Sequence, residues 1–295
     1  MQNKVFKNKI SAKQSGRVAV VNDLSSFGKC SLTASLPIFS CMGLQACPLP
    51  TAVLSCQTGF ENFFQQDMTF VWEDFFRSWQ KMGVVFDGIL SGYLTGSEQA
   101  EKVEDFFRRF GNDDTLFVVD PVLGDDGKPY PNTDGKLIAQ MRRLVSMADF
   151  CTPNLTELCL LTGVNPHEAV EKTDCEDFSD RIKAACAALM ADGCGAVAVT
   201  GIRTENSVKN FLMTSKGVTV TESPSYHVNM SGAGDIFSSI LTAKVLLGES
   251  LESAVAAADG FLTRAISDTA KNNGDAKHGV NFEKYLKYDG VDEEW

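Results

Sequence analysis

Short apolar runs alternate with longer segments of helical periodicity along most of this chain. Runs such as Val18–Val21 and Leu116–Val119 are continuously apolar, which is typical of strands in a parallel sheet that is covered on both faces. In Phe70–Met82, apolar residues recur every fourth position and therefore share one face of a helix. The expected strands are Val18–Val21, Gln45–Pro48, Thr51–Ser55, Phe86–Leu90, Leu116–Val119, Phe150–Cys151 and Ala196–Val199, followed by an antiparallel pair, Asn210–Met213 and Gly217–Thr221. The expected helices are Ser31–Met42, Phe70–Met82, Glu98–Phe110, Lys136–Met147, one that starts at Thr152, Ile236–Leu247 and Leu251–Ser267.

This alternation of strands and helices predicts an α/β fold with a mostly parallel central sheet and helices on both faces. The chain has 295 residues, and no change in composition marks a linker. We therefore expect a single domain over residues 18–290, preceded by a polar lead-in, residues 1–17, and followed by an acidic tail, residues 291–295.

Charge and cysteine usage narrow the class of protein. The net charge of −11 argues against nucleic acid as a partner, because nothing offsets repulsion from the phosphates. No apolar run approaches the roughly 20 residues of a membrane-spanning helix, and residues 1–10 lack the apolar centre of a secretory signal. The nine cysteines include no C-x-x-C pair, which favours reduced thiols in a cytoplasmic protein.

The segment Ser231–Asp235 carries the strongest chemical signal. Two glycines allow a tight turn, and the predicted helix Ile236–Leu247 follows at once. A loop that enters a helix directs backbone N–H groups and the positive end of the helix dipole at one point, which favours a phosphate. Asp235 beside such a site makes sense as a base that takes a proton from a hydroxyl attacking the phosphate. A glycine turn capped by an aspartate is the alternative.

Polar residues also follow one predicted strand after another. In an open α/β sheet the ligand crevice lies beyond the carboxyl ends of the strands, so we expect these side chains to face one cleft. The set consists of Asp23, Thr58, Tyr93, Asp120, Asp125, Thr152, Asn154, Glu157 and Thr200. Each has an ordinary alternative as a turn, a helix cap or a packing residue.

Three carboxylates in this set, Asp120, Asp125 and Glu157, would repel a bound phosphate. A magnesium ion resolves the conflict, because Mg²⁺ takes few protein carboxylates, keeps waters and bridges phosphate oxygens. That combination predicts nucleoside triphosphate chemistry. The polar segment 124–133 is then either a flap that closes over the phosphates or an exposed loop.

Four motifs together resemble the ribokinase-like small-molecule kinases, in particular the vitamin B6 branch. They are Ser-Gly-Ala-Gly-Asp (231–235), Asp-Pro-Val-Leu-Gly-Asp (120–125), Thr-Pro-Asn-x-x-Glu (152–157) and Leu-Ser-Gly-Tyr (90–93), and the resemblance covers Val18 to Ser267. It implies a three-layer α/β/α fold and ATP-dependent phosphorylation of the 5′-hydroxymethyl group of pyridoxal, pyridoxine or pyridoxamine. It also suggests a homodimer and leaves a monovalent cation open as a further cofactor.

The resemblance implies a role for each matching residue. Asp235 would be the catalytic base and would contact the substrate. The anion hole for the transferred phosphoryl group would consist of Gly232, Ala233 and Gly234. The ATP site would include Asp125, Tyr130, Thr152, Asn154, Glu157, Thr200, Gly201 and Gly232. The pyridine ring would lie against Asp23, Thr58 and Tyr93, and magnesium would be held by Asp120, Asp125 and Glu157.

Two departures leave ring recognition open. Cys56-Gln57-Thr58 stands where family members commonly have Asn-His-Thr or Thr-His-Thr, and Asp23 stands where many have serine. An acidic group there suits a protonated ring, which leads to the hypothesis that pyridoxamine is preferred over pyridoxal.

Three other functions stay open beside that of a vitamin B6 kinase. A hydroxymethylpyrimidine kinase is the nearest, although its usual Gly-Gly-Ala-Gly-Ile-Gln run is absent and Phe27–Ser31 stands there. A non-catalytic vitamin-binding relative and a sugar or nucleoside kinase are the others.

Overall fold

The computed structural model describes residues 15–171, 173, 177–227, 230–272 and 275–286. Residues 1–14 of the expected lead-in and the whole acidic tail lie outside these ranges. The strands are β1 (Arg17–Ser25), β2 (Gln45–Leu54), β3 (Gln65–Asp67), β4 (Gly88–Ser91), β5 (Leu116–Val119), β6 (Gly124–Asp125), β7 (Lys128–Pro129), β8 (Phe150–Cys151), β9 (Val197–Arg203), β10 (Ser207–Thr214) and β11 (Gly217–Pro224). The α-helices are α1 (Ser31–Cys41), α2 (Trp72–Met82), α3 (Ser97–Phe110), α4 (Gly135–Met147), α5 (Leu155–Thr162), α6 (Pro166–Glu171), α7 (Phe178–Ala191), α8 (Ala233–Leu246) and α9 (Leu251–Lys271).

The central sheet has the strand order β11-β10-β9-β8-β5-β4-β1-β2-β3. Its inner strands, β2, β1, β4, β5, β8 and β9, run parallel, whereas β3, β10 and β11 pair antiparallel with their neighbours. The mostly parallel sheet that the sequence predicted is therefore confirmed. Since parallel strands share one direction, their carboxyl ends meet at the same edge.

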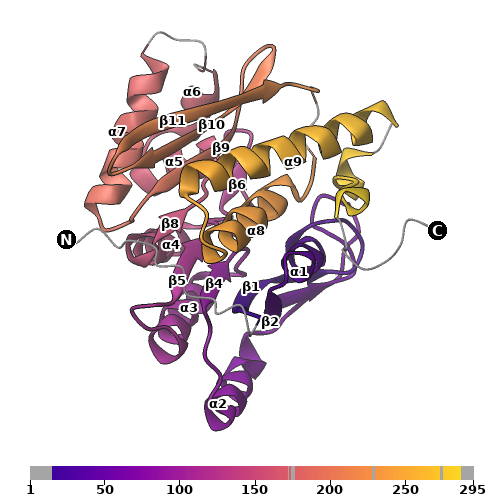
Figure 1. The fold of residues 1–295 in the computed structure, drawn as a ribbon, viewed down its shortest axis with the longest axis vertical. Helices are drawn as coiled ribbons and strands as arrows, with labels where there is room; N and C mark the ends of the chain where they lie inside the picture. Colours follow the sequence, from indigo (N-terminus) through magenta and orange to yellow (C-terminus); the bar gives the residue numbers. More distant parts are fainter. Residues whose placement is uncertain (1–14, 172, 174–176, 228–229, 273–274, 287–295) are drawn as a thin grey trace.

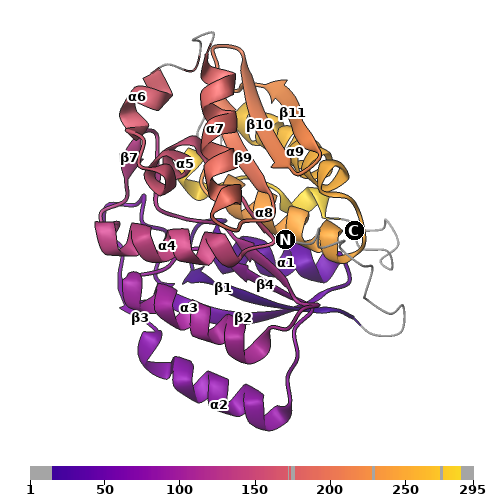
Figure 2. The ribbon, with the colours of Figure 1, turned by 90° about the vertical axis from the view of Figure 1, so that its left-hand side faces the viewer.

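Helices cover both faces of the sheet and complete three layers. Along β1, Ala19 and Val21 point into one core and Val18 and Val20 into the other, as the twofold alternation of a strand requires. The first core includes residues of α2, α3, α4, α5 and α7, and the second includes residues of α1, α8 and α9. Figure 1 shows α8 and α9 on one side of the sheet and α3 and α4 on the other, and Figure 2 gives the view at right angles.

The structure corrects several expected elements. Residues 45–54 form the single strand β2 rather than two strands, although Pro48 and Pro50 lie inside it. Proline lacks the ladder N–H, and it is tolerated here because β3 pairs only with Ala52–Leu54 at the end of β2. The elements that escaped the sequence prediction include β3, α6, α7 and the two short strands β6 and β7.

The two helices nearest the candidate site also begin elsewhere than expected. Helix α5 begins at Leu155 and not at Thr152, because Pro153 restricts the backbone of the residue before it and Asn154 provides the N-cap. Helix α8 begins at Ala233 rather than Ile236, with Gly232 as its N-cap. The glycine motif therefore forms the helix terminus itself.

Candidate active site

The carboxyl edge of the sheet carries the residues that the sequence singled out. Asp23 lies near the end of β1, and Tyr93, Asp120 and Thr152 follow β4, β5 and β8. Thr200 lies in β9 and forms a parallel bridge with Asn154 at the start of α5. The start of α8 contacts the same edge, because a Cβ atom placed on Gly234 would lie 4.0 Å from Asp120 Oδ2.

Asp235 is half-buried in the first turn of α8 and is held in a defined orientation. The side-chain amide of Asn22 donates a hydrogen bond of 2.9 Å to Asp235 Oδ1. Burial raises the pKa of Asp235 to about 6, and the charge of Asp23 raises it further, whereas hydrogen bonds from the Ser31 backbone and from Asn22 lower it. A carboxylate with a pKa near neutral is well matched to taking a proton from a hydroxyl.

Asn22 is a site residue that sequence reasoning missed. Its side-chain oxygen accepts hydrogen bonds from the backbone N–H groups of Asp23, at 3.0 Å, and Tyr93, at 2.9 Å. Gly92 leaves room for it, since a Cβ atom there would lie 2.5 Å from Asn22 Nδ2. One amide thus connects the candidate base to the two candidate ring-binding residues. The only sequence signal was its place beside Asp23 after an apolar run, which is equally typical of a turn.

The start of α8 has the backbone of an anion site. Gly232 adopts a φ of +80°, and a Cβ atom there would lie 2.0 Å from the Lys29 carbonyl oxygen. Only glycine fits this approach to the β1–α1 connection. The N–H groups of the first helical turn have no partner within their own helix, so they and the helix dipole favour an anion in front of Gly232–Gly234.

Buried carboxylates lie beside this helix start. Burial raises the pKa of Asp120 to about 7, and the charge of Asp235 adds to this, while the hydroxyls of Ser238 and Thr152 lower it. Burial and the charge of Asp120 raise the pKa of Glu157 well above its ordinary value. Burial raises the pKa of Tyr130, and the charges of these same carboxylates raise it further. Asp120 therefore interacts electrostatically with both Asp235 and Glu157.

Glu157 is held by backbone groups. It forms a capping box with Asn154: Glu157 Oε2 accepts from the Asn154 N–H at 2.7 Å, and Asn154 Oδ1 accepts from the Glu157 N–H at 2.9 Å. Glu157 Oε1 accepts from the Leu123 N–H at 3.2 Å, and the Asn154 side chain donates to the Gly124 carbonyl at 2.8 Å. The helix cap that the sequence suggested as an alternative role for these residues is therefore present. Through Leu123 and Gly124 it also fixes the loop that carries Asp125.

Residues 124–129 form a β-hairpin rather than an irregular exposed loop. Asp126 and Gly127 form its turn with positive φ values of 47° and 76°, a geometry that suits a two-residue hairpin. The Gly127 N–H donates to Thr156 Oγ1 at 2.9 Å, and a Cβ atom on Gly127 would lie 3.2 Å from the Cα of His167. The hairpin therefore rests on α5 and α6, next to the acidic cluster.

Thr200 and Gly201 form a bulge in β9. The pairing of β9 with β10 shifts register between Lys209 and Phe211, and Gly201 has a φ of +67°. Asn210 lies opposite the bulge: its side-chain oxygen accepts from the Gly201 N–H at 2.9 Å, and its amide donates to Asp259 of α9 at 3.0 Å. Asn210, which sequence reasoning missed, thus connects the candidate residue Gly201 to α9.

The candidate ring site is lined by polar side chains of different exposure. Asp23 is buried, and burial raises its pKa, while hydrogen bonds from Ser31 and Ser25 lower it. Tyr93 is half-buried, and its pKa is raised by burial and by the charges of Asp23 and Asp67, while a hydrogen bond with Gln65 lowers it. Thr58 is exposed, next to the buried Gln57.

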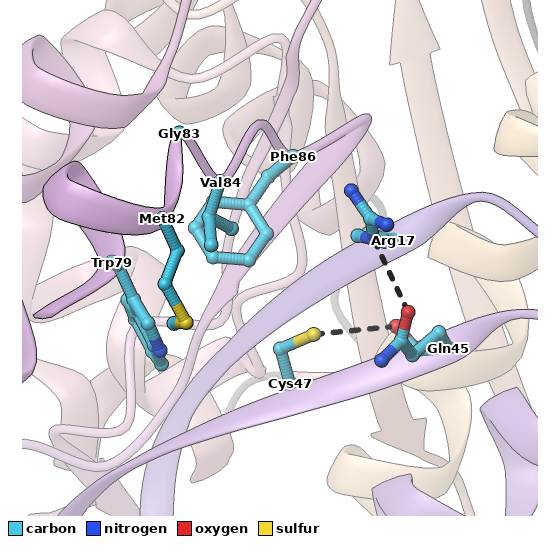
Figure 3. A pocket seen from close by; sticks show the side chains of 8 residues that line it. All are labelled: Arg17, Gln45, Cys47, Trp79, Met82, Gly83, Val84 and Phe86. Carbon is cyan, nitrogen blue, oxygen red and sulfur yellow. Dashed lines mark hydrogen bonds between the residues drawn. The ribbon is translucent and has the colours of Figure 1, made fainter.

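A separate hollow lies at the opposite, amino-terminal edge of the sheet (Figure 3). It has a volume of about 360 Å³ and is lined by Arg17, Gln45, Cys47, Trp79, Met82, Gly83, Val84 and Phe86. Arg17 and Gln45 are the first residues of β1 and β2, so this hollow contains none of the candidate site residues.

Fold and site together define a small-molecule kinase of the ribokinase-like type. The chain belongs to the phosphomethylpyrimidine kinase family, whose model matches residues 26–281. In the described part of the chain, no helix is long and apolar enough to cross a membrane.

Known proteins support this membership. The chain is 29% identical over 252 residues to a pyridoxine/pyridoxal/pyridoxamine kinase of Bordetella avium, covering 82% of each protein. It is 25% identical over 290 residues to a hydroxymethylpyrimidine/phosphomethylpyrimidine kinase of Staphylococcus aureus, covering 95% of this chain and 93% of the relative. A Bacteroides thetaiotaomicron protein, provisionally named a phosphomethylpyrimidine kinase and crystallised with pyridoxal, superposes with a TM-score of 0.86 at 34% identity, covering 92% of this chain and 95% of that one.

Proposed function

We propose that this chain is an ATP-dependent kinase that phosphorylates the 5′-hydroxymethyl group of pyridoxal, pyridoxine or pyridoxamine. The observation that carries the proposal is the position of Asp235, which stands in the first turn of α8 and is connected through Asn22 to Asp23 and Tyr93. A base between an anion site and a ring site is the arrangement that phosphoryl transfer to an aromatic alcohol requires. The pyridoxal-bound structure of the Bacteroides relative supports the same substrate class.

The chemistry assigns one task to each part of the site. Asp235 accepts the proton of the substrate hydroxyl while the hydroxyl oxygen forms a bond to the γ-phosphorus of ATP. At the same time the bond from that phosphorus to the β–γ bridging oxygen breaks, and ADP leaves. The N–H groups at Gly232–Gly234 stabilise the charge on the transferred group. Asn22 keeps the Asp235 carboxylate facing the hydroxyl. Thr152, Asn154, Thr200, Gly201 and Tyr130 are proposed to lie along the ATP phosphates.

The donor set fits magnesium, with Asp120, Asp125 and Glu157 as the residues that would hold it through its waters. All three provide oxygen, the ligand that Mg²⁺ prefers. No cluster of three or more histidine, cysteine, aspartate or glutamate side chains within the described ranges has the arrangement of a direct metal site. When bound, the ion would neutralise phosphate charge. Burial is the main reason why the pKa values of Asp120 and Glu157 are raised, and a neighbouring charge, that of Asp235 for Asp120 and that of Asp120 for Glu157, raises each further. A cation would relieve this second contribution.

A hydroxymethylpyrimidine kinase is the second candidate, because the Staphylococcus relative carries that activity in its name and the matching family model is named for phosphomethylpyrimidine kinase. The same base and anion site would serve it, so only the ring pocket separates the two candidates. A cytoplasmic location, a homodimer and a monovalent cation remain predictions.

An ADP-release assay with pyridoxal, pyridoxamine, pyridoxine and hydroxymethylpyrimidine tests the proposal. We expect ATP-dependent turnover with the vitamers at a kcat/KM well above that for the pyrimidine. From Asp23 we further expect pyridoxamine to exceed pyridoxal. A clear pyridoxal preference would overturn that vitamer order, a preference for the pyrimidine would favour the second candidate, and no turnover with any acceptor would indicate a non-catalytic relative.

The pH dependence of kcat/KM tests the base separately. Only ionised Asp235 accepts a proton, and its pKa is raised to about 6. The rate should therefore be level above roughly pH 7 and fall about tenfold per unit well below pH 6. The Asn22→Ala variant should move this acid limb to higher pH, since it removes a donor that favours the ionised carboxylate. A rate that stays level down to about pH 5 would count against Asp235 as the base.

A further inference from the structure

Three aromatic side chains from distant parts of the sequence meet beside the candidate ring site. Phe27 and His278 lie with ring centroids 5.2 Å apart, Phe27 and Phe60 5.6 Å apart, and Phe60 and His278 5.8 Å apart. Phe27 belongs to the β1–α1 connection, Phe60 follows Thr58 in the loop after β2, and His278 ends the short 3₁₀ helix Ala276–His278. These separations are typical of edge-to-face and tilted aromatic pairs.

Gln57 connects all three ring-bearing segments. Its backbone N–H donates to the Phe27 carbonyl at 3.1 Å, and its carbonyl accepts from the Phe60 N–H at 3.2 Å. Its side-chain amide donates to the Lys277 carbonyl at 3.0 Å, while the side-chain oxygen accepts from the Gly59 N–H at 2.6 Å. Backbone groups therefore engage both ends of the Gln57 amide. These hydrogen bonds link Gln57 to the segments that carry the three rings.

The segment that carries His278, residues 275–286, is also bound to the residues around the candidate anion site. The Ser231 N–H donates to the Ala276 carbonyl at 3.1 Å, directly before Gly232. Lys29 forms a parallel bridge with Gly279, and its ammonium group donates to Asn281 at 2.6 Å and to Glu283 at 2.9 Å. His278 is therefore held in a defined place relative to the base and the phosphoryl site.

The cluster retains surface for a ligand. The Phe27 side chain is 53% exposed although hydrogen bonds anchor the segments around it. A flat aromatic ring that bound above Asp23 and Thr58 would cover this apolar surface and complete the stacking geometry. Resting on the proposed function, we propose that Phe27, Phe60 and His278 form an aromatic wall for the ring of the phosphate acceptor, and that Gln57 is the residue that positions this wall.

Single substitutions with separate KM values for the two substrates test the wall. Phe27→Ala and His278→Ala should each raise KM for the vitamer roughly three- to tenfold, the value of one aromatic contact, with kcat and KM for ATP changed less than about twofold. Gln57→Ala should raise KM for the vitamer in the same way, because it frees the turn at Lys277. Phe70→Ala is the matched control, since Phe70 is 72% exposed beyond β3, and it should change neither KM.

The design separates failure of the wall from failure of the proposed function. Wild-type turnover with vitamers, combined with an unchanged vitamer KM in Phe27→Ala and His278→Ala, would overturn the wall and leave the kinase intact. If the wild type phosphorylates hydroxymethylpyrimidine instead, the proposed substrate fails and the same KM comparison is made with that ring. Equal increases in KM for ATP and for the acceptor in these variants would show that the three rings support the fold and do not contact the acceptor. A wild type that binds no aromatic acceptor would overturn both proposals.

Discussion

Asp235→Asn is expected to lower kcat by about a thousandfold while KM for ATP stays within a few fold. General base catalysis typically contributes 10²- to 10⁴-fold, and an amide cannot accept the proton. The fold should be retained, because the asparagine side chain keeps an oxygen that can accept the 2.9 Å hydrogen bond from Asn22. Removal of this negative charge should also lower the pKa of Asp120, whose carboxyl is sensitive to Asp235.

Asp134→Asn is the matched control for this variant. Asp134 caps α4 by accepting from the Leu137 N–H at 2.8 Å, and asparagine caps a helix about as well as aspartate. The control should therefore have wild-type kcat and an unchanged Tm. Steady-state kinetics with the preferred vitamer, together with ATP titrations, provide the measurement. A kcat within tenfold of wild type in Asp235→Asn would assign the base to another group.

Periodicity predicted the sheet and most of its helices because both cores follow local rules. Residues of β1 alternate between the two cores. The predicted stripe Val71, Phe75 and Trp79 packs against the first core but is only partly buried, and the fully buried residues of α2 are Trp72 and Phe76. The prolines in β2 misled the prediction. The free-energy cost of a proline in a strand depends on whether a neighbouring strand needs a backbone N–H donor at that position, which proline lacks. That depends on the position of β3, which the local sequence does not encode.

The local structure of the candidate site was predictable where a motif carries its own geometry and not where contacts span the chain. The glycine turn that leads into α8 and the capping box at Asn154 depend on residues within one turn, and both appear in the structure, although α8 begins at Ala233 and not at the expected Ile236. Asn22 acts on a carboxylate 213 positions away, and Gln57 holds a turn 220 positions away. Such partners become visible only once the sheet order is known. Gln57, which left ring recognition open in the sequence, is engaged by the backbone instead.

Gly232→Ala should remove most activity through the backbone. Its Cβ atom would lie 2.0 Å from the Lys29 carbonyl oxygen, so either the β1–α1 connection or the start of α8 must move. Loss of one anion-hole donor costs about 10²- to 10³-fold in kcat, and we expect a decrease of at least about a hundredfold. The same movement would displace Ser31, whose backbone holds Asp235, and the acid limb of the pH profile should therefore shift as well.

Gly43→Ala separates this clash from the ordinary cost of a left-handed residue. Gly43 also has a positive φ, +76°, but a Cβ atom there would meet nothing within 4 Å. It should lower the free energy of unfolding by about 1–2 kcal/mol and leave kcat unchanged. Gly232→Ala should lose more stability than this, because it adds the collision with Lys29 to the same backbone strain. Urea unfolding of both variants measures the difference, and equal losses of stability with a wild-type kcat in Gly232→Ala would show that the helix start is not part of the catalytic machinery.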